Sequence, residues 1–515
     1  MFDFYKLKLV KISTDSFVGI RKSSTGEELE FHLPNGFEDF PEENFDEIKN
    51  LFFGMYRTFR KFERDNLGTN RLRLNTTEFQ RDQDQTTLSP SGVSIQTEEG
   101  ECVLYSKIKM LERILEAYDD LAINSIKKKN RRSEDIDYSQ IHRYLDRAIY
   151  LEDDVIYIDS MELPRPSIQY ESTDLINLYC YILDEIVQQL HGDVSENINA
   201  RLQDIQFLAQ QFRDDYLTIN QSIFDKDTFL ETILILKEAL DNIDKNTYYK
   251  DPDYWQLYEA IEIFLYGEIN PNQSDGDFWG IRGFSMLWED MCNTFFFKTY
   301  RDNILYADTD IPLKDHFNSE REDSAQNRVG NNSTHDGSKP WNQWIYRTIS
   351  GIPYPSKKGF FGWNELFCIE LDLKPGTFVY NNLQDKYFKE RDRDKATFRR
   401  FLRPDLVFEN KGSHLSIRII DYKYVPLSFY TNEMSSKKFR DDIIKQLTYE
   451  LAIQRTHKCL ESWFFIPHFY KSDPDPLLLG EIASEVRTPT GENTNIQIFK
   501  ANFLYIQKVY LDEIQ

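Results

Sequence analysis

The sequence RPDLVFENKGSHLSIRIIDYKYV, residues 403–425, reads as two short strands joined by a polar turn. The apolar run after Asp405 predicts one strand, the run that ends at Asp421 predicts the next, and NKGSH predicts the hairpin turn between them. Residues two apart on a strand point to the same face, so Asp421 and Lys423 are expected to lie together. The hairpin is then expected to bring Asp405 beside Asp421.

Two adjacent carboxylates and an ammonium group suit the hydrolysis of a phosphodiester bond. Asp405 and Asp421 are expected to hold a hard cation, Mg²⁺ or alternatively Mn²⁺, through their oxygen atoms. Lys423 is expected to position or deprotonate a water, or to stabilise charge that develops on phosphorus. Each motif alone is common on strands and turns. Their combination on successive strands predicts metal-assisted phosphodiester hydrolysis.

Helices on either side of the hairpin carry three further candidate residues. The apolar helix expected over residues 284–300 contains Glu289, which is either a third metal ligand or a surface residue of that helix. The helix expected over residues 438–456 contains Gln446 and Tyr449, three apart on one face. These two side chains either hydrogen-bond a phosphate or the catalytic lysine, or belong to a half-buried stripe of the helix.

The net charge of −24 excludes a protein that binds nucleic acid over its whole surface, because phosphate would be repelled on average. One stretch departs from this acidity: residues 386–440 contain fourteen Lys and Arg against seven Asp and Glu. Within it, Arg399, Arg400 and Arg403 lead directly into Asp405 and are candidate contacts to DNA phosphates. A solvated surface helix is the alternative for this arginine cluster.

The five cysteines are widely spaced and include no CxxC pair. This spacing argues for a reducing compartment and against a disulfide framework or a structural zinc site. No apolar run approaches the ~18 residues that a membrane span needs, and the N-terminal segment lacks the pattern of a signal peptide. We therefore expect a cytoplasmic protein with no membrane partner.

At 515 residues the chain is long enough for two or three domains. Strand patterns followed by amphipathic helices predict a β-rich, mixed N-terminal domain over residues 1–165 and a helical region over residues 166–270. After a break over residues 271–283, strands alternate with helices, which predicts an α/β unit with a mixed sheet over residues 271–515. Within this unit, residues 495–507 are expected to be strand.

These motifs resemble those of the PD-(D/E)XK nucleases. Asp405 after a proline, the DYK triplet that begins at Asp421, and the order helix, strand, strand, helix all match that family. More narrowly, LWEDMCNTFF, RPDLVF, IIDYKY and DIIKQLTYE are similar to the LlaJI-type and McrC-like restriction nucleases, which usually have Ala where Tyr422 stands. The resemblance covers about residues 284–470, and the HLPNGFEDF turn is similar to the first domain of that family.

The resemblance implies an α/β restriction-endonuclease-like domain, with a mixed sheet flanked by helices, that cuts double-stranded DNA in a bacteriophage-restricting system. It implies an McrB-like AAA+ GTPase as partner, which would bind GTP, translocate DNA and hold the chain in an oligomeric motor complex. The N-terminal half would dock on that motor. The roles implied are Mg²⁺ ligation by Asp405, Asp421 and Glu289, activation or orientation of water by Lys423, and support of the site by Gln446 and Tyr449.

Two other functions are compatible with these residues. A regulatory subunit would bind and stimulate an AAA+ motor and use the nuclease fold as a scaffold, although a scaffold does not need Asp405, Asp421 and Lys423 together. A DNA-repair nuclease of the same fold would use the same chemistry as a restriction nuclease.

Overall fold

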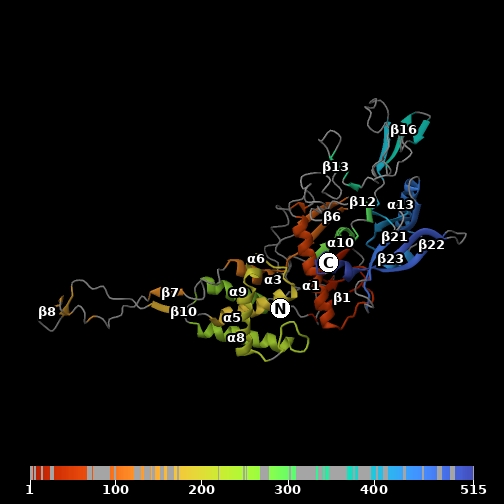
Figure 1. The fold of residues 1–515 in the computed structure, drawn as a ribbon. Helices are drawn as coiled ribbons and strands as arrows, with labels where there is room; N and C mark the ends of the chain where they lie inside the picture. The colour runs from red at the N-terminus through yellow and green to blue at the C-terminus, as the bar shows by residue number, and fades with distance from the viewer. Residues whose placement is uncertain are drawn as a thin grey trace.

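The protein is a mixed α/β structure with two seven-stranded sheets and a block of helices (Figure 1). None of the helices in the described ranges is both long and apolar enough to cross a membrane. The computed structural model describes residues 4, 7–12, 16–23, 28–66, 72–73, 93–97, 100–120, 129–132, 141, 145, 147–150, 156–158, 167–170, 173–218, 220–247, 250, 252–266, 278–300, 303–308, 332–333, 340–342, 344–346, 368–374, 377–380, 396–401, 404–409, 416–432, 436–454, 458–471, 478–487 and 493–513.

The first seven-stranded sheet has the order β1-β3-β2-β11-β6-β5-β4. Its central strand, β11 (Phe278–Arg282), pairs antiparallel with both β2 and β6. Gly19 and Gly280 face each other across the β2–β11 pair, and a Cβ atom on Gly280 would lie 2.2 Å from the backbone oxygen of Val18. Only glycine permits this approach. The other strands are β1 (Lys8–Val10), β2 (Phe17–Lys22), β3 (Leu29–His32), β4 (Leu72–Arg73), β5 (Val93–Thr97) and β6 (Gly100–Tyr105).

The second seven-stranded sheet contains the residue 403–425 hairpin at its centre, in the order β15-β12-β19-β20-β21-β23-β22. Strands β19 and β20 are antiparallel, whereas β20–β21 and β21–β23 are parallel pairs. The sheet is therefore mixed. Its strands are β12 (Ile304–Asp308), β15 (Trp344–Tyr346), β19 (Leu406–Glu409), β20 (Ser416–Tyr422), β21 (Lys458–His468), β22 (Gly480–Arg487) and β23 (Asn493–Asn502).

Helices cover both faces of the second sheet. On one face, Phe296 of α10 (Phe284–Thr299) packs against Phe465 of β21 with ring centroids 5.6 Å apart. On the other face, Tyr430 of α12 (Leu427–Asn432) stacks on Phe464 at 5.3 Å. Successive strand residues point to opposite faces, so α10 and α12 lie on opposite sides of the sheet. Two more helices flank the sheet: α13 (Lys437–Ile453), which contacts β20 and β21, and α14 (Phe503–Tyr510), which packs on α10.

The long helix α1 (Phe45–Asn66) joins the first sheet to the end of the chain. Phe52 packs against Trp279 of β11 at 5.1 Å, and Gln507 of α14 donates a hydrogen bond to the hydroxyl of Thr58 at 3.0 Å. Figure 1 shows the remaining helices gathered beside this unit. They are α3 (Lys109–Asp120), α5 (Thr173–Gln189), α6 (Glu196–Ala200), α7 (Leu202–Tyr216), α8 (Phe229–Asn246) and α9 (Pro252–Tyr266).

Smaller sheets lie outside the two large ones: three strand pairs, β7–β10, β8–β9 and β13–β14, and the three-stranded sheet β17-β16-β18. The β7–β10 and β8–β9 pairs lie beyond the helical block, away from both sheets (Figure 1). The strands are β7 (Lys129–Arg132), β8 (Ile149–Tyr150), β9 (Ile156–Tyr157), β10 (Ser167–Tyr170), β13 (Asn332–Ser333), β14 (Pro340–Asn342), β16 (Cys368–Lys374), β17 (Thr377–Tyr380) and β18 (Ala396–Phe401).

Two sequence expectations are wrong in their local structure. The break expected over residues 271–283 contains strand β11, because Gly280, which suggests a loop, serves the close approach to β2. Residues 503–507, expected to continue a strand, begin α14 instead. The side chain of Asn502 caps this helix by accepting a hydrogen bond from the Tyr505 N–H at 3.2 Å, and that cap overrides the strand-like composition.

Candidate active site

Asp405 and Asp421 lie side by side at the ends of β19 and β20. The register pairs Leu406 with Ile420, and continuing it by one residue places Asp405 opposite Asp421. Oδ2 of Asp405 accepts a hydrogen bond from the backbone N–H of Tyr422 at 2.5 Å. Asp421 is only 1% exposed. The hairpin thus brings the two carboxylates together, as the sequence predicts.

The two carboxylates have opposite pKa shifts. Burial and the charges of Asp421 and Glu289 raise the pKa of Asp405 well above its usual value. Burial also disfavours ionisation of Asp421, but Lys423 and Lys445 outweigh it and lower the pKa of Asp421. A side-chain hydrogen bond joins the two acids. Asp421 is therefore the more readily ionised member of the pair, and a cation near both would offset the burial and the repulsion that raise the pKa of Asp405.

The ammonium group of Lys423 lies between two buried carboxylates. Its Nζ atom is 2.9 Å from Oδ2 of Asp421 and 3.0 Å from Oδ1 of Asp442. Burial alone would lower the pKa of Lys423, but Asp421, Asp442 and Asp405 outweigh it and raise that pKa. The lysine therefore stays protonated, which favours orienting water and stabilising negative charge over removing a proton from water.

Asp442 is a site residue that the sequence reasoning missed. It is buried on α13, one turn before Gln446. The signal was present in the sequence, because residues four apart on a helix share a face and Gln446 is itself a candidate. Oδ2 of Asp442 has no hydrogen-bond partner within the described part of the chain.

The buried face of α13 presents further polar groups on the Lys423 side of the sheet. Gln446 and Tyr449 are both 0% exposed, so they are fully buried rather than half-buried. Within the described residues, neither polar atom of the Gln446 side chain has a hydrogen-bond partner, and nor does the Tyr430 hydroxyl. Burying such groups unpaired is costly. Their position near the charges of Lys423 and Asp442 indicates a site that receives water or a polar ligand.

Glu289 lies on α10, on the opposite side of the sheet from α13. Its side chain is partly exposed, and its charge raises the pKa of Asp405 and, behind the larger effects of burial and Asp405, that of the buried Cys292 thiol. Glu289 is therefore close enough to act on Asp405 through its charge. Its role as a metal ligand stays a prediction.

The three candidate DNA-contacting arginines are only partly described. Arg399 and Arg400 lie on β18, where their backbones pair with those of Glu370 and Ile369 of β16. The helix considered for this cluster is wrong, because residues 396–401 form a strand. Arg403 and the side chains of Arg399 and Arg400 lie outside the described residues, so their contact with DNA stays a prediction.

The donor set of the site fits a hard divalent cation. Asp405 and Asp421 supply carboxylate oxygens, and Oδ2 of the buried Asp421 already faces a positive charge, the Lys423 ammonium group at 2.9 Å. No group of three or more His, Cys, Asp or Glu side chains among the described residues is placed to hold a metal. Two carboxylates suit Mg²⁺ or Mn²⁺, because Mg²⁺ is commonly held by one or two carboxylates with waters and substrate phosphate completing its shell.

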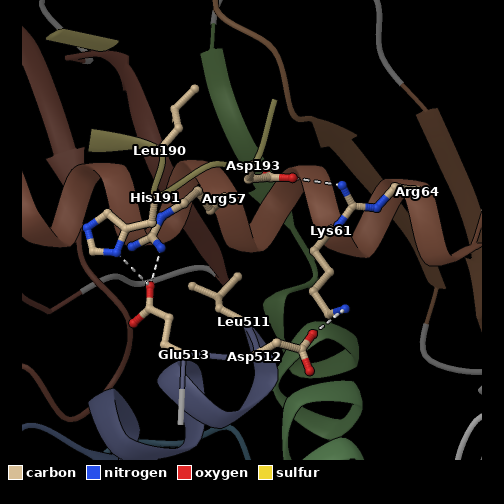
Figure 2. Close-up of a pocket in the computed structure, with 9 residues that line it drawn as sticks. All are labelled: Arg57, Lys61, Arg64, Leu190, His191, Asp193, Leu511, Asp512 and Glu513. Atoms are coloured by element: carbon tan, nitrogen blue, oxygen red, sulfur yellow. Dashed lines mark hydrogen bonds and ion pairs between the residues drawn. The ribbon is translucent and has the colours of Figure 1, made fainter. Parts of the chain in front are cut away.

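A separate hollow of about 310 Å³ lies between α1, the turn after α5 and the end of the chain (Figure 2). Basic side chains of α1 line it, but acidic partners neutralise them. Arg64 pairs with Asp193 at 2.8 Å, and Arg57 pairs with Glu513. This hollow is lined by different residues from those of the Asp405–Asp421 pair, and its ion pairs tie α1 to the C-terminal segment.

The chain matches no protein-family model and no curated protein. Among solved structures, it is similar to a chain of a refined half-complex from a tetradecameric assembly of Thermococcus gammatolerans McrB AAA+ hexamers with bound McrC. The match covers 96% of this chain and 81% of that chain, with 9% sequence identity and a TM-score of 0.24. With a TM-score this low, the similarity supports no conclusion about the fold or the function of this chain.

Proposed function

We propose that the chain is an Mg²⁺-dependent DNA endonuclease subunit that hydrolyses phosphodiester bonds. The observation that carries the proposal is the placement of Asp405 opposite Asp421, with the ammonium group of Lys423 2.9 Å from Asp421. An acid pair with opposite pKa shifts, one member of it buried, beside a lysine whose side chain is 13% exposed is costly to maintain in a scaffold. Such perturbed clusters are characteristic of functional sites.

The residues divide the chemistry between them. Asp405 and Asp421 would hold the metal ion, which when bound supplies a Lewis acid at the phosphate and lowers the pKa of a bound water. Lys423 brings a fixed positive charge and N–H donors that orient the attacking water and stabilise charge on the phosphate oxygens. The unpaired side-chain amide of Gln446 offers a donor and an acceptor on the same side of the sheet.

We also propose an McrB-like AAA+ GTPase as the partner in a restriction system. The support is the resemblance of the LWEDMCNTFF, RPDLVF, IIDYKY and DIIKQLTYE segments to the McrC-like nucleases. The net charge of −24 agrees with this division of labour, because an acidic chain gains from a partner that supplies most of the DNA contacts.

The test is cleavage of plasmid DNA by the purified chain with Mg²⁺, with and without the McrB-like partner and GTP. Wild type and Asp421→Ala are compared with Glu450→Gln as a matched control. Glu450 is a buried acid on α13 that accepts a hydrogen bond from Ser462 at 2.6 Å, away from the proposed metal ligands. We expect cleavage by wild type and Glu450→Gln, and at least a ~100-fold loss in Asp421→Ala.

Absence of cleavage by wild type under every condition, with the partner bound, would refute the nuclease proposal. If the chain then still accelerated GTP hydrolysis by the partner, and Asp421→Ala did so equally, the regulatory-subunit function would replace it.

A further inference from the structure

We propose that Asn35 is a positioning residue for Lys423, through which the first sheet sets the geometry of the proposed nuclease site. Asn35 lies in the HLPNGFEDF segment, residues 32–40, between β3 and α1. The inference rests on the proposed function, and it adds a residue that is far from the site in sequence.

Asn35 hydrogen-bonds both the side chain and the backbone of Tyr424, the residue that follows Lys423. Its backbone N–H donates to the Tyr424 hydroxyl at 3.1 Å, and its side-chain Nδ2 donates to the Tyr424 carbonyl at 3.3 Å. The Tyr424 ring also packs against Phe284, the first residue of α10, with centroids 4.9 Å apart. Tyr424 is thus fixed from the first sheet and from α10 together.

The backbone at Lys423 depends on such support because the sheet ends there. The ladder between β19 and β20 ends at the Leu406–Ile420 pair, and β20 itself ends at Tyr422. The N–H of Lys423 donates to the carbonyl of Phe465 at 3.0 Å. Beyond Tyr422, the backbone path is therefore set by the Phe465 carbonyl, which holds Lys423, and by Asn35, which holds Tyr424.

The same segment also holds the end of β21, the strand beside β20. The N–H of Phe469 donates to the carbonyl of Gly36 at 2.9 Å, and the ring of Phe37 stacks on that of Phe469 at 5.2 Å. Gly36 has φ +85°, and a Cβ there would lie 2.1 Å from the Pro467 carbonyl oxygen. Because this contact is so close, residues 32–40 cannot move relative to the end of β21. A displacement of the first sheet would therefore also displace the ends of β20 and β21 beside Lys423.

The chemical consequence follows from the position of the ammonium group. Lys423 must keep its donors aligned with Asp421 and with an attacking water, and a displacement of about 1 Å in such geometry costs about 100-fold in rate. Loss of the Asn35 contacts is expected to lower kcat. KM for DNA is expected to change little, because both of these Asn35 hydrogen bonds go to Tyr424, which is neither a candidate metal ligand nor a candidate DNA contact.

The experiment uses Asn35→Asp and Tyr424→Phe in the full chain under the conditions that support cleavage by wild type. Asn35→Asp keeps the size of the side chain but removes the Nδ2 donor, and Tyr424→Phe removes only the hydroxyl. Asn44→Asp is the matched control, because it likewise removes an Nδ2 donor, here to Glu47 Oε1 at 3.0 Å, while the aspartate can still cap α1 by accepting from the Glu47 N–H. Each variant is measured for kcat, KM, thermal unfolding and amide hydrogen exchange across residues 421–425.

We expect a 10- to 100-fold lower kcat in Asn35→Asp, a smaller loss in Tyr424→Phe, KM within twofold, and faster exchange at residues 423–425. Asn44→Asp should match wild type in kcat, in KM and in exchange at residues 423–425. Wild-type kcat in both test variants, or unchanged exchange at residues 423–425, would overturn the inference. If wild type itself never cleaves DNA, the proposed function fails and the catalytic role of Asn35 fails with it, while exchange still reports separately whether Asn35 holds these residues.

Discussion

Asp442→Asn should weaken catalysis far more than it weakens the fold. In the wild type, Lys423 Nζ is shared between Asp421 at 2.9 Å and Asp442 at 3.0 Å. The substitution keeps the volume and one acceptor oxygen, but it removes one of the two charges that hold the ammonium group. Lys423 is then drawn toward Asp421 and competes with the metal ion for that carboxylate.

The size of both effects can be worked from these contacts. Removing one partner of a buried ion pair costs about 3–5 kcal/mol when the other charge is left alone. Here Lys423 keeps Asp421, and the asparagine oxygen still accepts a hydrogen bond. We therefore expect a loss of about 1–2 kcal/mol in the free energy of unfolding, with kcat lowered ~10- to 100-fold and a higher Mg²⁺ concentration needed for half-maximal cleavage.

The assay combines urea unfolding with plasmid cleavage over a series of Mg²⁺ concentrations. Glu450→Gln is the control, since it also neutralises a buried acid on α13 without touching Lys423. The reasoning is refuted if Asp442→Asn and Glu450→Gln have the same kcat and the same Mg²⁺ dependence.

Three further predictions concern stability and reactivity. Gly36→Ala should destabilise the chain by at least about 2 kcal/mol in chemical unfolding, because it combines a positive φ with a Cβ 2.1 Å from the Pro467 carbonyl; an unchanged midpoint would contradict the close fit. Burial raises the pKa of Glu185, so ionising it lowers stability above that pKa. Glu185→Gln should therefore raise stability at pH 7, and this gain should shrink as the pH falls through the raised pKa of Glu185 and vanish near the ordinary carboxyl pKa; a gain independent of pH would contradict this cause. Burial raises the pKa of Cys459 to about 12, so its thiol should resist labelling at pH 8 in the native chain and react once urea unfolds it, as site-resolved mass spectrometry would show; rapid native labelling would contradict the assigned burial.

The pairing of Asp405 with Asp421 could be predicted because it depends on local patterns. A hairpin turn fixes the register of its two strands, so the two acids follow from residues 403–425 alone. Helix α13 could likewise be predicted, since its apolar and polar residues repeat with helical spacing over residues 437–453.

The contacts missed by the sequence analysis join residues that are distant along the chain. The spacing to Gln446 places Asp442 on the same helix face, but its contact with Lys423 depends on how α13 packs on β20 and β21, which no local pattern specifies. The bond from Asn35 to Tyr424 spans 389 residues. Strand β11 was missed for the same reason, because its partners β2 and β6 both lie within the first 105 residues of the chain.

The central place of β11 in the first sheet has a consequence for synthesis on the ribosome. Strand β6 ends at Tyr105, whereas the strand that must fill the gap between β6 and β2 is complete only at Arg282, 177 residues later. At about 5–20 residues per second, the growing chain spends roughly 9–35 s with β2 and β6 lacking their shared neighbour. Two inner strand edges are open to wrong pairing during that time, so the nascent N-terminal region is a natural client for chaperones, and slow translation of residues 106–282 should increase aggregation.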